Sequence, residues 1–387
     1  MVMVNAEWST RYRPITVEGL APTYDTVVVG AGPAGIMAAV EAASACDRVL
    51  VLEASSLPRE KSCGGMLNKY SLAALERFGG VPEEMVLDPR WISFRYYHMD
   101  REVKKPTDVR FLNVDRGMFD AWLLSLLPAN VDVAAQVRLA EVSQSPVGVT
   151  VRAMPTAGGA AVGREVSCRH LIAADGPRAT VRERLQLRPF NRYISVQEYV
   201  RIEPGALEPY FDCIYSRRFS RDYGIGYIIP KGEVAIIGSI FYPGTRECAH
   251  KHEEVLAILR GIYPFGEAVK RETWIAAHLT RPADLVAGQG RILLAGEGGG
   301  FLSCTSGEGI SFALNSGRIA GRAVAESVMA ESRVASDALN RYERALRPLK
   351  RNLAFRMRAF PFMNNYACKN LACHIPASIV SKLTERV

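Results

Sequence analysis

A glycine-rich turn between an apolar strand and a helix is the feature that most constrains the fold of this chain. Residues 26–29 form a short β-branched run, and three glycines follow it at the spacing G-x-G-x-x-G, before a run of small residues. In a dinucleotide-binding βαβ unit, the first glycine allows a sharp turn and the second lets the backbone approach a pyrophosphate. The third lets the helix lie close to the strand, and the helix N-terminus holds the phosphates. The residues that the pattern predicts at this nucleotide site are Gly30, Gly32, Pro33, Ala34 and Gly35.

An acidic residue ends the next predicted strand. Residues 48–52 are mostly apolar, and Glu53 and Ala54 follow them, with Glu53 lying 23 positions after Gly30. A carboxylate at about this distance holds the ribose diol of a bound dinucleotide. A glycine-rich turn followed by an ordinary surface glutamate is the alternative explanation.

A second glycine-rich block late in the chain predicts which dinucleotide is bound. An apolar strand at 291–295 ends at Gly296 and Glu297, and a helical pattern begins after Gly307 and Gly309. Glu297 can accept a hydrogen bond from a ribityl hydroxyl. The N–H groups near Gly309 and Ile310 can face the electron-rich pyrimidine edge of a reduced flavin. A nicotinamide cofactor would not need this second anchor, whereas the extended FAD would.

Length and composition are those of a globular protein with more than one domain. The 387 residues are enough for two or three domains, with 48% apolar and 23% charged residues. No apolar run approaches the roughly 20 residues that span a bilayer. The first two dozen residues contain no apolar signal region, and the eight cysteines are scattered without framework spacing. We therefore expect a cytoplasmic protein that has no metal site and binds no nucleic acid.

The net positive charge is concentrated at the C-terminal end. Residues 341–387 contain ten Lys or Arg against two Glu, a net of +8, and the remaining 38 basic and 38 acidic residues balance. Such a tail can contact an anionic membrane peripherally or bind an acidic electron carrier. Charge by itself favours a solvated helical face. Candidates for insertion into a membrane are Phe355, Phe360, Phe362 and Met363.

These patterns predict an α/β fold. We expect a Rossmann-like FAD-binding domain, an inserted antiparallel sheet that covers the substrate, and a helical C-terminal tail. The expected divisions are a lead-in at 1–24, the FAD-binding domain at 25–190 and 276–330, the sheet domain at 191–275, and the basic tail at 331–387. A hairpin is expected around Gly158 and Gly159.

The order of these motifs resembles that of FAD enzymes of the aromatic hydroxylase type. The shared segments include a D-R-x-x-F-D-x-x-L helix that begins at Asp115, and Asp175-Gly176 after a buried strand. Within that group, K-S-C-G-G at 61–65 and Y-E-R-x-L-R at 342–347 are similar to the geranylgeranyl reductase family. The resemblance implies FAD contacts by Arg116, Asp175 and Gly176, and by Cys63 and Gly64, in addition to the glycines and acids named above.

The resemblance also implies an activity. Reduced flavin would deliver hydride to a C=C bond of a hydrophobic, isoprenoid-like substrate, with electrons from NAD(P)H or a ferredoxin-like carrier. An FAD-dependent monooxygenase that acts through a flavin peroxide is the alternative enzyme. A halogenase would be expected to have Trp at the positions of Ile225 and Tyr227, so that version is disfavoured. A third alternative is a non-catalytic flavoprotein that binds a partner through its basic tail.

Two residues are the candidates for chemistry in front of the flavin. Cys63 follows Lys61, whose charge favours a thiolate, and it could donate a proton, tune the flavin or be a small buried hydrophobe. A redox pair with Cys304 is a further hypothesis. Tyr227 is predicted in the substrate pocket, at a segment where the family has Tyr-x-Trp-x-Phe-Pro. The family also has Gly-Asp where this chain has Gly296-Glu297.

Overall fold

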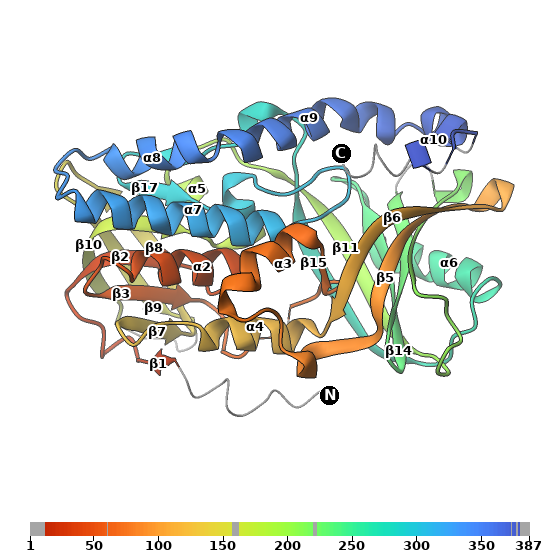
Figure 1. The fold of residues 1–387 in the computed structure, drawn as a ribbon, viewed down its shortest axis with the longest axis horizontal. Coiled ribbons are helices and arrows are strands. Elements are labelled where there is room, and N and C mark those ends of the chain that lie inside the picture. The colour runs from red at the N-terminus through yellow and green to blue at the C-terminus, as the bar shows by residue number, and fades with distance from the viewer. Residues whose placement is uncertain are drawn as a thin grey trace.

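A computed structural model describes residues 12–59, 61–156, 162–219, 223–372, 374–376 and 378–379, which form two sheets, with helices packed on them (Figure 1). The predicted hairpin tip at Gly158 and Gly159 lies outside the described residues, as does the side chain of Ile225. In the described chain, nine strands form the first sheet and eight form the second.

The first sheet carries the predicted dinucleotide-binding unit. Its main path runs in the order β1-β7-β3-β2-β10-β17-β16, with the β8–β9 hairpin attached to β10. The pairs β2/β3, β2/β10, β3/β7 and β10/β17 are parallel. The bounds are β1 (Arg13–Pro14), β2 (Thr23–Val29), β3 (Val49–Glu53), β7 (Val131–Ala135), β8 (Val137–Gln144), β9 (Val149–Pro155), β10 (Arg164–Ala173), β16 (Gly288–Gln289) and β17 (Ile292–Leu294). Alternate residues of β2 and β3 enter two separate cores, so both faces of the sheet are covered.

The helices of this unit pack on one another and on the sheet through small residues. They are α2 (Pro33–Ala42), α3 (Lys69–Leu75), α4 (Arg116–Ser125), α5 (Thr180–Arg184) and α7 (Ile310–Met329). Gly30 has φ +101°, and a Cβ there would lie 2.3 Å from the carbonyl oxygen of Ala174. A Cβ at Gly35 would lie 1.8 Å from the carbonyl oxygen of Gly30. The first and third glycines of the motif therefore have the tight turn and the close helix approach that their spacing predicts.

The second sheet lies beside the first and is mostly antiparallel. Its order is β15-β11-β14-β13-β12-β5-β6-β4, in which β5 and β12 are parallel. The bounds are β4 (Met66–Leu67), β5 (Val86–His98), β6 (Val103–Val114), β11 (Asn191–Arg201), β12 (Tyr210–Tyr215), β13 (Tyr223–Lys231), β14 (Val234–Phe241) and β15 (Ala268–His278), with α6 (Cys248–Arg260) packed on one face. The sheet thus takes strands from 66–67 and 86–114 as well as from the expected range 191–275. Strands β5 and β6 form a local hairpin with each other, and β5 joins the rest of the sheet by pairing with β12, far along the chain. Local patterns therefore could not assign this hairpin to the sheet.

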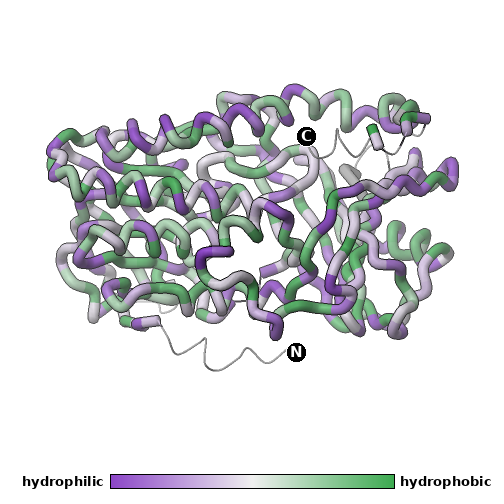
Figure 2. Tube along the Cα trace, viewed as in Figure 1, coloured by the Kyte–Doolittle hydropathy of each residue, from purple (hydrophilic) through white to green (hydrophobic). Residues whose placement is uncertain are grey.

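Three helices at the C-terminus run along one edge of the molecule, from the first sheet to the second (Figure 1). They are α8 (Asp337–Ala345), α9 (Arg347–Met363) and α10 (Tyr366–Ala372). The Tyr342 hydroxyl donates to the carbonyl of Leu294 at 2.8 Å, and the Tyr366 hydroxyl donates to Asp100 at 2.9 Å. Hydrophilic and hydrophobic residues alternate along α8 and α9 (Figure 2). None of the helices in the described ranges combines the length and apolar character needed to cross a bilayer.

Candidate cofactor and substrate site

One large cavity extends between the two sheets and beneath α9. Its volume is about 1570 Å³, which exceeds the roughly 300–1,000 Å³ of a typical small-molecule site. Gly35 packs behind the cavity against Gly30, and all other predicted site residues line it. These are Gly30, Gly32, Pro33, Ala34, Glu53, Ala54, Cys63, Gly64, Arg116, Asp175, Gly176, Tyr227, Gly296, Glu297, Gly307, Gly309 and Ile310. The fold therefore brings segments from both sheets to one space that has room for a cofactor and a second molecule.

The nucleotide end of the cavity is formed by β2, β3 and the N-terminus of α2. Glu53 ends β3 and is 6% exposed. Its carboxylate accepts hydrogen bonds from the backbone N–H groups of Ala31 and Ser55, both at 2.8 Å. Each carboxylate oxygen has two lone pairs, so a ribose hydroxyl can still donate to it. The turn, the helix N-terminus and the carboxylate fit the phosphates and ribose of FAD.

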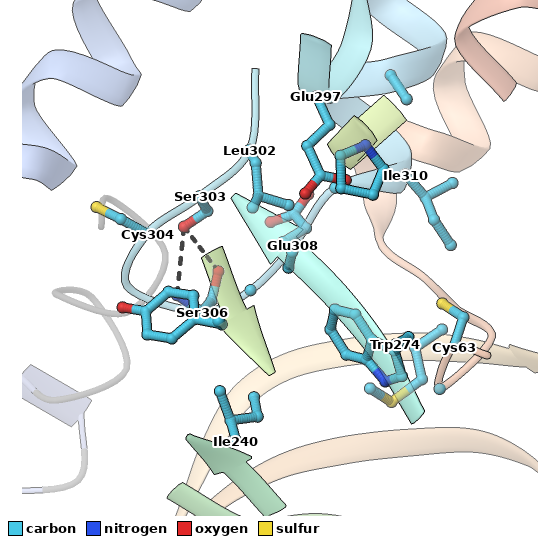
Figure 3. A pocket seen from close by; sticks show the side chains of 18 of the residues that line it. Cys63, Ile240, Trp274, Glu297, Leu302, Ser303, Cys304, Ser306, Glu308 and Ile310 are labelled. Atoms are coloured by element: carbon cyan, nitrogen blue, oxygen red, sulfur yellow. Dashed lines mark hydrogen bonds between the residues drawn. The ribbon is translucent and has the colours of Figure 1, made fainter. Parts of the chain in front are cut away.

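The second predicted anchor lies at the N-terminus of α7. Gly296 has φ +60°, and a Cβ there would lie 2.9 Å from the Cβ of Ala34. Gly309 precedes the first residue of α7, and Glu297 and Ile310 lie at the same end of the cavity (Figure 3). The Glu297 carboxylate accepts from the backbone N–H of Ala277 at 2.6 Å, and burial raises the pKa of Glu297. Glu297, whose side chain is longer than the aspartate that the family has at this position, therefore also connects this loop to β15 of the second sheet. The motif did not predict this contact.

Cys63 faces the guanidinium of Arg116. The Asp115 side chain accepts from the N–H of Met118 at 2.8 Å and caps α4, which places Arg116 in its first turn. Burial acts to raise the pKa of the Cys63 thiol. The charge of Arg116, the N–H of Gly65 at 3.5 Å from Sγ and the smaller effect of Lys61 outweigh burial, so the pKa lies below its ordinary value.

A buried lysine that sequence reasoning missed supports the Cys63 loop. Lys231 Nζ donates to Asn113 Oδ1 at 2.6 Å, to the carbonyl of Val114 at 2.9 Å and to the carbonyl of Gly65 at 3.3 Å. Burial lowers the pKa of Lys231 to about 7. The lysine ties the loop to β6. Its sequence context, Pro-Lys-Gly at the end of a strand, is that of an ordinary exposed turn, so no local signal could have found it.

Aromatic side chains of the second sheet form the other half of the cavity. Lining rings include Trp91, Phe94, Tyr96, Phe111, Phe211, Tyr227 and Trp274. Phe211 packs edge-on against both Phe94 and Tyr227, with ring centroids 5.0 and 5.7 Å apart. This wall can exclude water from a reaction in front of the flavin. The second sheet therefore provides a largely aromatic wall where the sequence predicted a pocket for a hydrophobic substrate.

The two cavity cysteines do not form a pair. Cys63 and Cys304 both have free thiols, and Figure 3 shows them on opposite sides of the cavity. Burial raises the pKa of Cys304 to about 11, which makes it a neutral thiol at neutral pH. The hypothesis of a redox pair is therefore not supported. Within the described ranges, no three His, Cys, Asp or Glu side chains are grouped so that they could hold a metal ion.

Comparisons with known proteins agree with this geometry. The family described as FAD binding domain matches residues 23–354. The protein CbrA of Escherichia coli O9:H4 (strain HS) is 27% identical over 371 residues, which cover 91% of this chain and 95% of CbrA. Two solved structures share the fold. A geranylgeranyl bacteriochlorophyll reductase-like protein from Thermoplasma acidophilum has a TM-score of 0.75 and 19% identity, covering 90% of this chain and 89% of its own. The p-nitrophenol 4-monooxygenase PnpA from Pseudomonas putida DLL-E4 has a TM-score of 0.65 and 17% identity, covering 92% of this chain and 93% of its own.

Proposed function

The chain belongs to the FAD binding domain family, and we propose that it reduces a C=C bond of a hydrophobic, isoprenoid-like substrate. The coarser statement, an FAD-dependent oxidoreductase, follows from the family and from the shared fold. The observation that supports the C=C reductase is the large cavity between the sheets, in which aromatic side chains of the second sheet and the predicted FAD-binding residues line one continuous space. Similarity to the geranylgeranyl reductase-like fold supports the reductase.

The residues of the chain have distinct proposed roles. Reduced FAD, when bound, supplies the hydride. Gly32 and the N-terminus of α2 bind its phosphates, and Glu53 binds a ribose hydroxyl. The second sheet orients the substrate and excludes water. Cys63 lies beside Arg116, whose positive charge helps to lower the pKa of the thiol, and we propose that this thiol tunes the flavin or donates a proton to the substrate.

A monooxygenase is the second candidate because the fold is shared with p-nitrophenol 4-monooxygenase. Anaerobic turnover separates the two. The FAD-loaded protein is photoreduced without oxygen and mixed with farnesol as the probe. A reductase reoxidises the flavin and yields a product that has gained two hydrogens. Flavin that stays reduced until oxygen is admitted, with a product that has gained one oxygen atom, identifies a monooxygenase. A non-catalytic flavoprotein gives neither product.

Electrons are proposed to come from NAD(P)H or from a ferredoxin-like carrier. The chain has no second G-x-G-x-x-G fingerprint that would indicate a separate nicotinamide site. Anaerobic mixing of the oxidised holoprotein with NADPH, NADH or reduced ferredoxin, followed by flavin absorbance, identifies the donor. Reduction by ferredoxin alone would favour the carrier.

We also propose that the C-terminal helices contact an anionic lipid surface. Phe355, Phe362 and Leu371 are 51%, 69% and 65% exposed, and basic side chains of α9 lie among them. Phe355 and Phe362 also line the cavity, so this surface adjoins the cavity. Exposed aromatic residues beside basic ones are typical of interfacial helices. Co-sedimentation with phosphatidylglycerol vesicles, but not with phosphatidylcholine vesicles, is expected, and the Phe355→Ser/Phe362→Ser double variant should lose it. Binding to ferredoxin without binding to vesicles would indicate the acidic carrier instead.

A further inference from the structure

A polar pair lies in the otherwise aromatic wall of the cavity. Gln197 of β11 and Tyr227 of β13 both line the cavity and are 1% and 4% exposed. Gln197 Nε2 donates a hydrogen bond of 2.7 Å to the Tyr227 hydroxyl oxygen. Burying polar groups in an apolar wall is unfavourable unless their hydrogen-bonding capacity is used. The pair therefore requires an explanation beyond packing.

A glycine makes this pair possible. Strand β14 lies between β11 and β13, and its Gly238 is the register partner of both Gln197 and Tyr227. The three residues form one row across the sheet, so their side-chain positions share one face. A Cβ at Gly238 would lie 2.0 Å from Cζ of Tyr227. The tyrosine ring thus crosses β14 directly over the glycine to reach Gln197.

The pair keeps unused hydrogen-bonding capacity. Gln197 Oε1 is buried and has no partner among the described residues. The Tyr227 oxygen accepts from the amide, and the side chains of Ser195 and Trp274 also lie near it. Ser195 Oγ and Trp274 Nε1 are themselves buried without a partner among the described residues, so this polar group keeps a donor as well as an acceptor for a ligand. Turning the amide over exchanges the roles of Gln197 and Tyr227 in their hydrogen bond, and at least one donor and one acceptor remain in either orientation. Burial raises the pKa of Tyr227 to about 12, so the hydroxyl is a neutral donor at neutral pH.

We propose that Gln197 and Tyr227 together bind a hydroxyl group of the substrate, which is therefore an otherwise apolar alcohol or phenol. A hydroxyl both donates and accepts and so matches the remaining donor and acceptor, whereas an ether only accepts and a hydrocarbon does neither. Phe211, Ile229 and Ile240 line the same region and restrict water there, which strengthens the discrimination. The inference rests on the proposed function only for the position of the substrate cavity, and not for the reaction.

Matched probes test this proposal in the FAD-loaded protein. The pairs are farnesol with farnesyl methyl ether, and p-cresol with 4-methylanisole, each titrated by tryptophan fluorescence and by flavin absorbance. In at least one pair the hydroxyl compound should bind about tenfold more tightly than its methyl ether. Tyr227→Phe and Gln197→Leu should each remove most of that preference and leave ether binding within about twofold of wild type.

Two further variants separate recognition from folding. Gly238→Ala keeps both polar groups but displaces the Tyr227 ring, and it should also lose the preference. Tyr263→Phe is the matched control, because its hydroxyl bonds Asp212 at 2.8 Å and Tyr263 does not line the cavity. It should keep the preference. Bound FAD and the melting temperature report that each variant is folded.

The outcomes are distinguishable from those of the proposed function. Absence of a hydroxyl preference in both pairs, whether the compounds bind equally or not at all, overturns the inference. A preference that survives both Gln197→Leu and Tyr227→Phe overturns it as well. If the hydroxyl preference is found but the anaerobic enzyme saturates no C=C bond, the proposed reduction fails and the inference stands.

Discussion

At the level of single residues, the charges around Arg116 lower the pKa of the Cys63 thiol against the opposing effect of burial. Arg116 bonds Asp120 at 2.7 Å, and Arg59 reaches the same carboxylate at 3.2 Å. Two guanidinium groups therefore share one carboxylate, and Lys61 adds a further positive charge close to Cys63. An anionic thiolate offsets this excess of positive charge.

The first prediction concerns the reactivity of Cys63. In the flavin-free protein, iodoacetamide should modify Cys63 at pH values below the roughly 8.5 at which ordinary thiols ionise. Cys304 should remain unmodified because its pKa is raised to about 11. Arg116→Gln removes the largest opposing charge and should move the reaction of Cys63 to higher pH. Peptide mass spectrometry measures each site separately. Identical pH profiles for Cys63 in the two proteins would contradict this account.

A buried carboxylate supplies the second prediction. Asp175 Oδ2 accepts from the N–H of Val181 at 2.8 Å, whereas Oδ1 is buried without a partner among the described residues. Burial raises the pKa of Asp175 to about 6, above its value of about 4 in the unfolded chain. The unfolded state therefore ionises first, and the charged group destabilises the fold increasingly as the pH rises from about 4 to 6.

Asp175→Asn should therefore stabilise the flavin-free protein at pH 8, by up to about 3 kcal/mol, because the amide can keep the Val181 bond without the charge. The advantage should shrink as the pH falls towards about 4. Melting temperatures of both proteins over this pH range measure the effect. A difference that does not change with pH would mean that the titration of Asp175 is not its cause.

At the scale of elements, the contact between α2 and α7 depends on two glycines. A Cβ at Gly317 would lie 2.0 Å from the carbonyl oxygen of Ala34, and one at Gly321 would lie 2.2 Å from that of Ala38. The backbones thus touch without intervening side chains. This close contact keeps the N-termini of both helices at the cavity, where Ala34 and Ile310 line the wall.

The third prediction follows from this contact. Alanine favours a helix over glycine by about 1 kcal/mol, yet Gly317→Ala should destabilise the protein by about 1–3 kcal/mol, since the methyl group must push the helices apart. Gly117→Ala in α4 is the control, because its Cβ would meet only the Asp115 side chain, at 3.3 Å. Chemical denaturation compares the two. A Gly317→Ala variant as stable as the wild type would show that α2 and α7 can move apart without a loss of stability.

At the scale of the whole molecule, the predicted FAD site is assembled from distant parts of the chain. Glu53 ends β3, Arg116 begins α4, and Glu297 bonds β15 of the second sheet. The tail then runs across both sheets, with Tyr342 bonded to Leu294 of the first sheet and Tyr366 bonded to Asp100 in the turn between β5 and β6 of the second. A ligand that contacts all these segments should stabilise them as one unit.

The fourth prediction is that FAD raises the melting temperature of the flavin-free protein. A concentration one hundred times the dissociation constant contributes about 2.7 kcal/mol. Glu53→Gln should bind FAD about tenfold more weakly, because a charged acceptor for the ribose is lost. Glu76→Gln, outside the cavity lining, should bind as the wild type does. A Glu53→Gln variant with unchanged affinity would place the ribose elsewhere.

Local signals in the sequence were sufficient to predict part of the fold and of the site. Gly30 and Gly35 require close backbone approaches that only glycine permits, and an acid after β3 is recognisable from its distance to them. The predicted α/β class and the helical tail are confirmed, because hydrophobic periodicity records which faces are buried.

The surroundings of these motifs depend on contacts between residues far apart in the chain. The second sheet includes the β5–β6 hairpin because β5 pairs with the distant β12. Lys231 becomes buried beneath Gly65 although its neighbours indicate an exposed turn. Gln197 and Tyr227 meet only because Gly238 lies between them in register. Register and burial depend on partners far along the chain, and no local pattern encodes them.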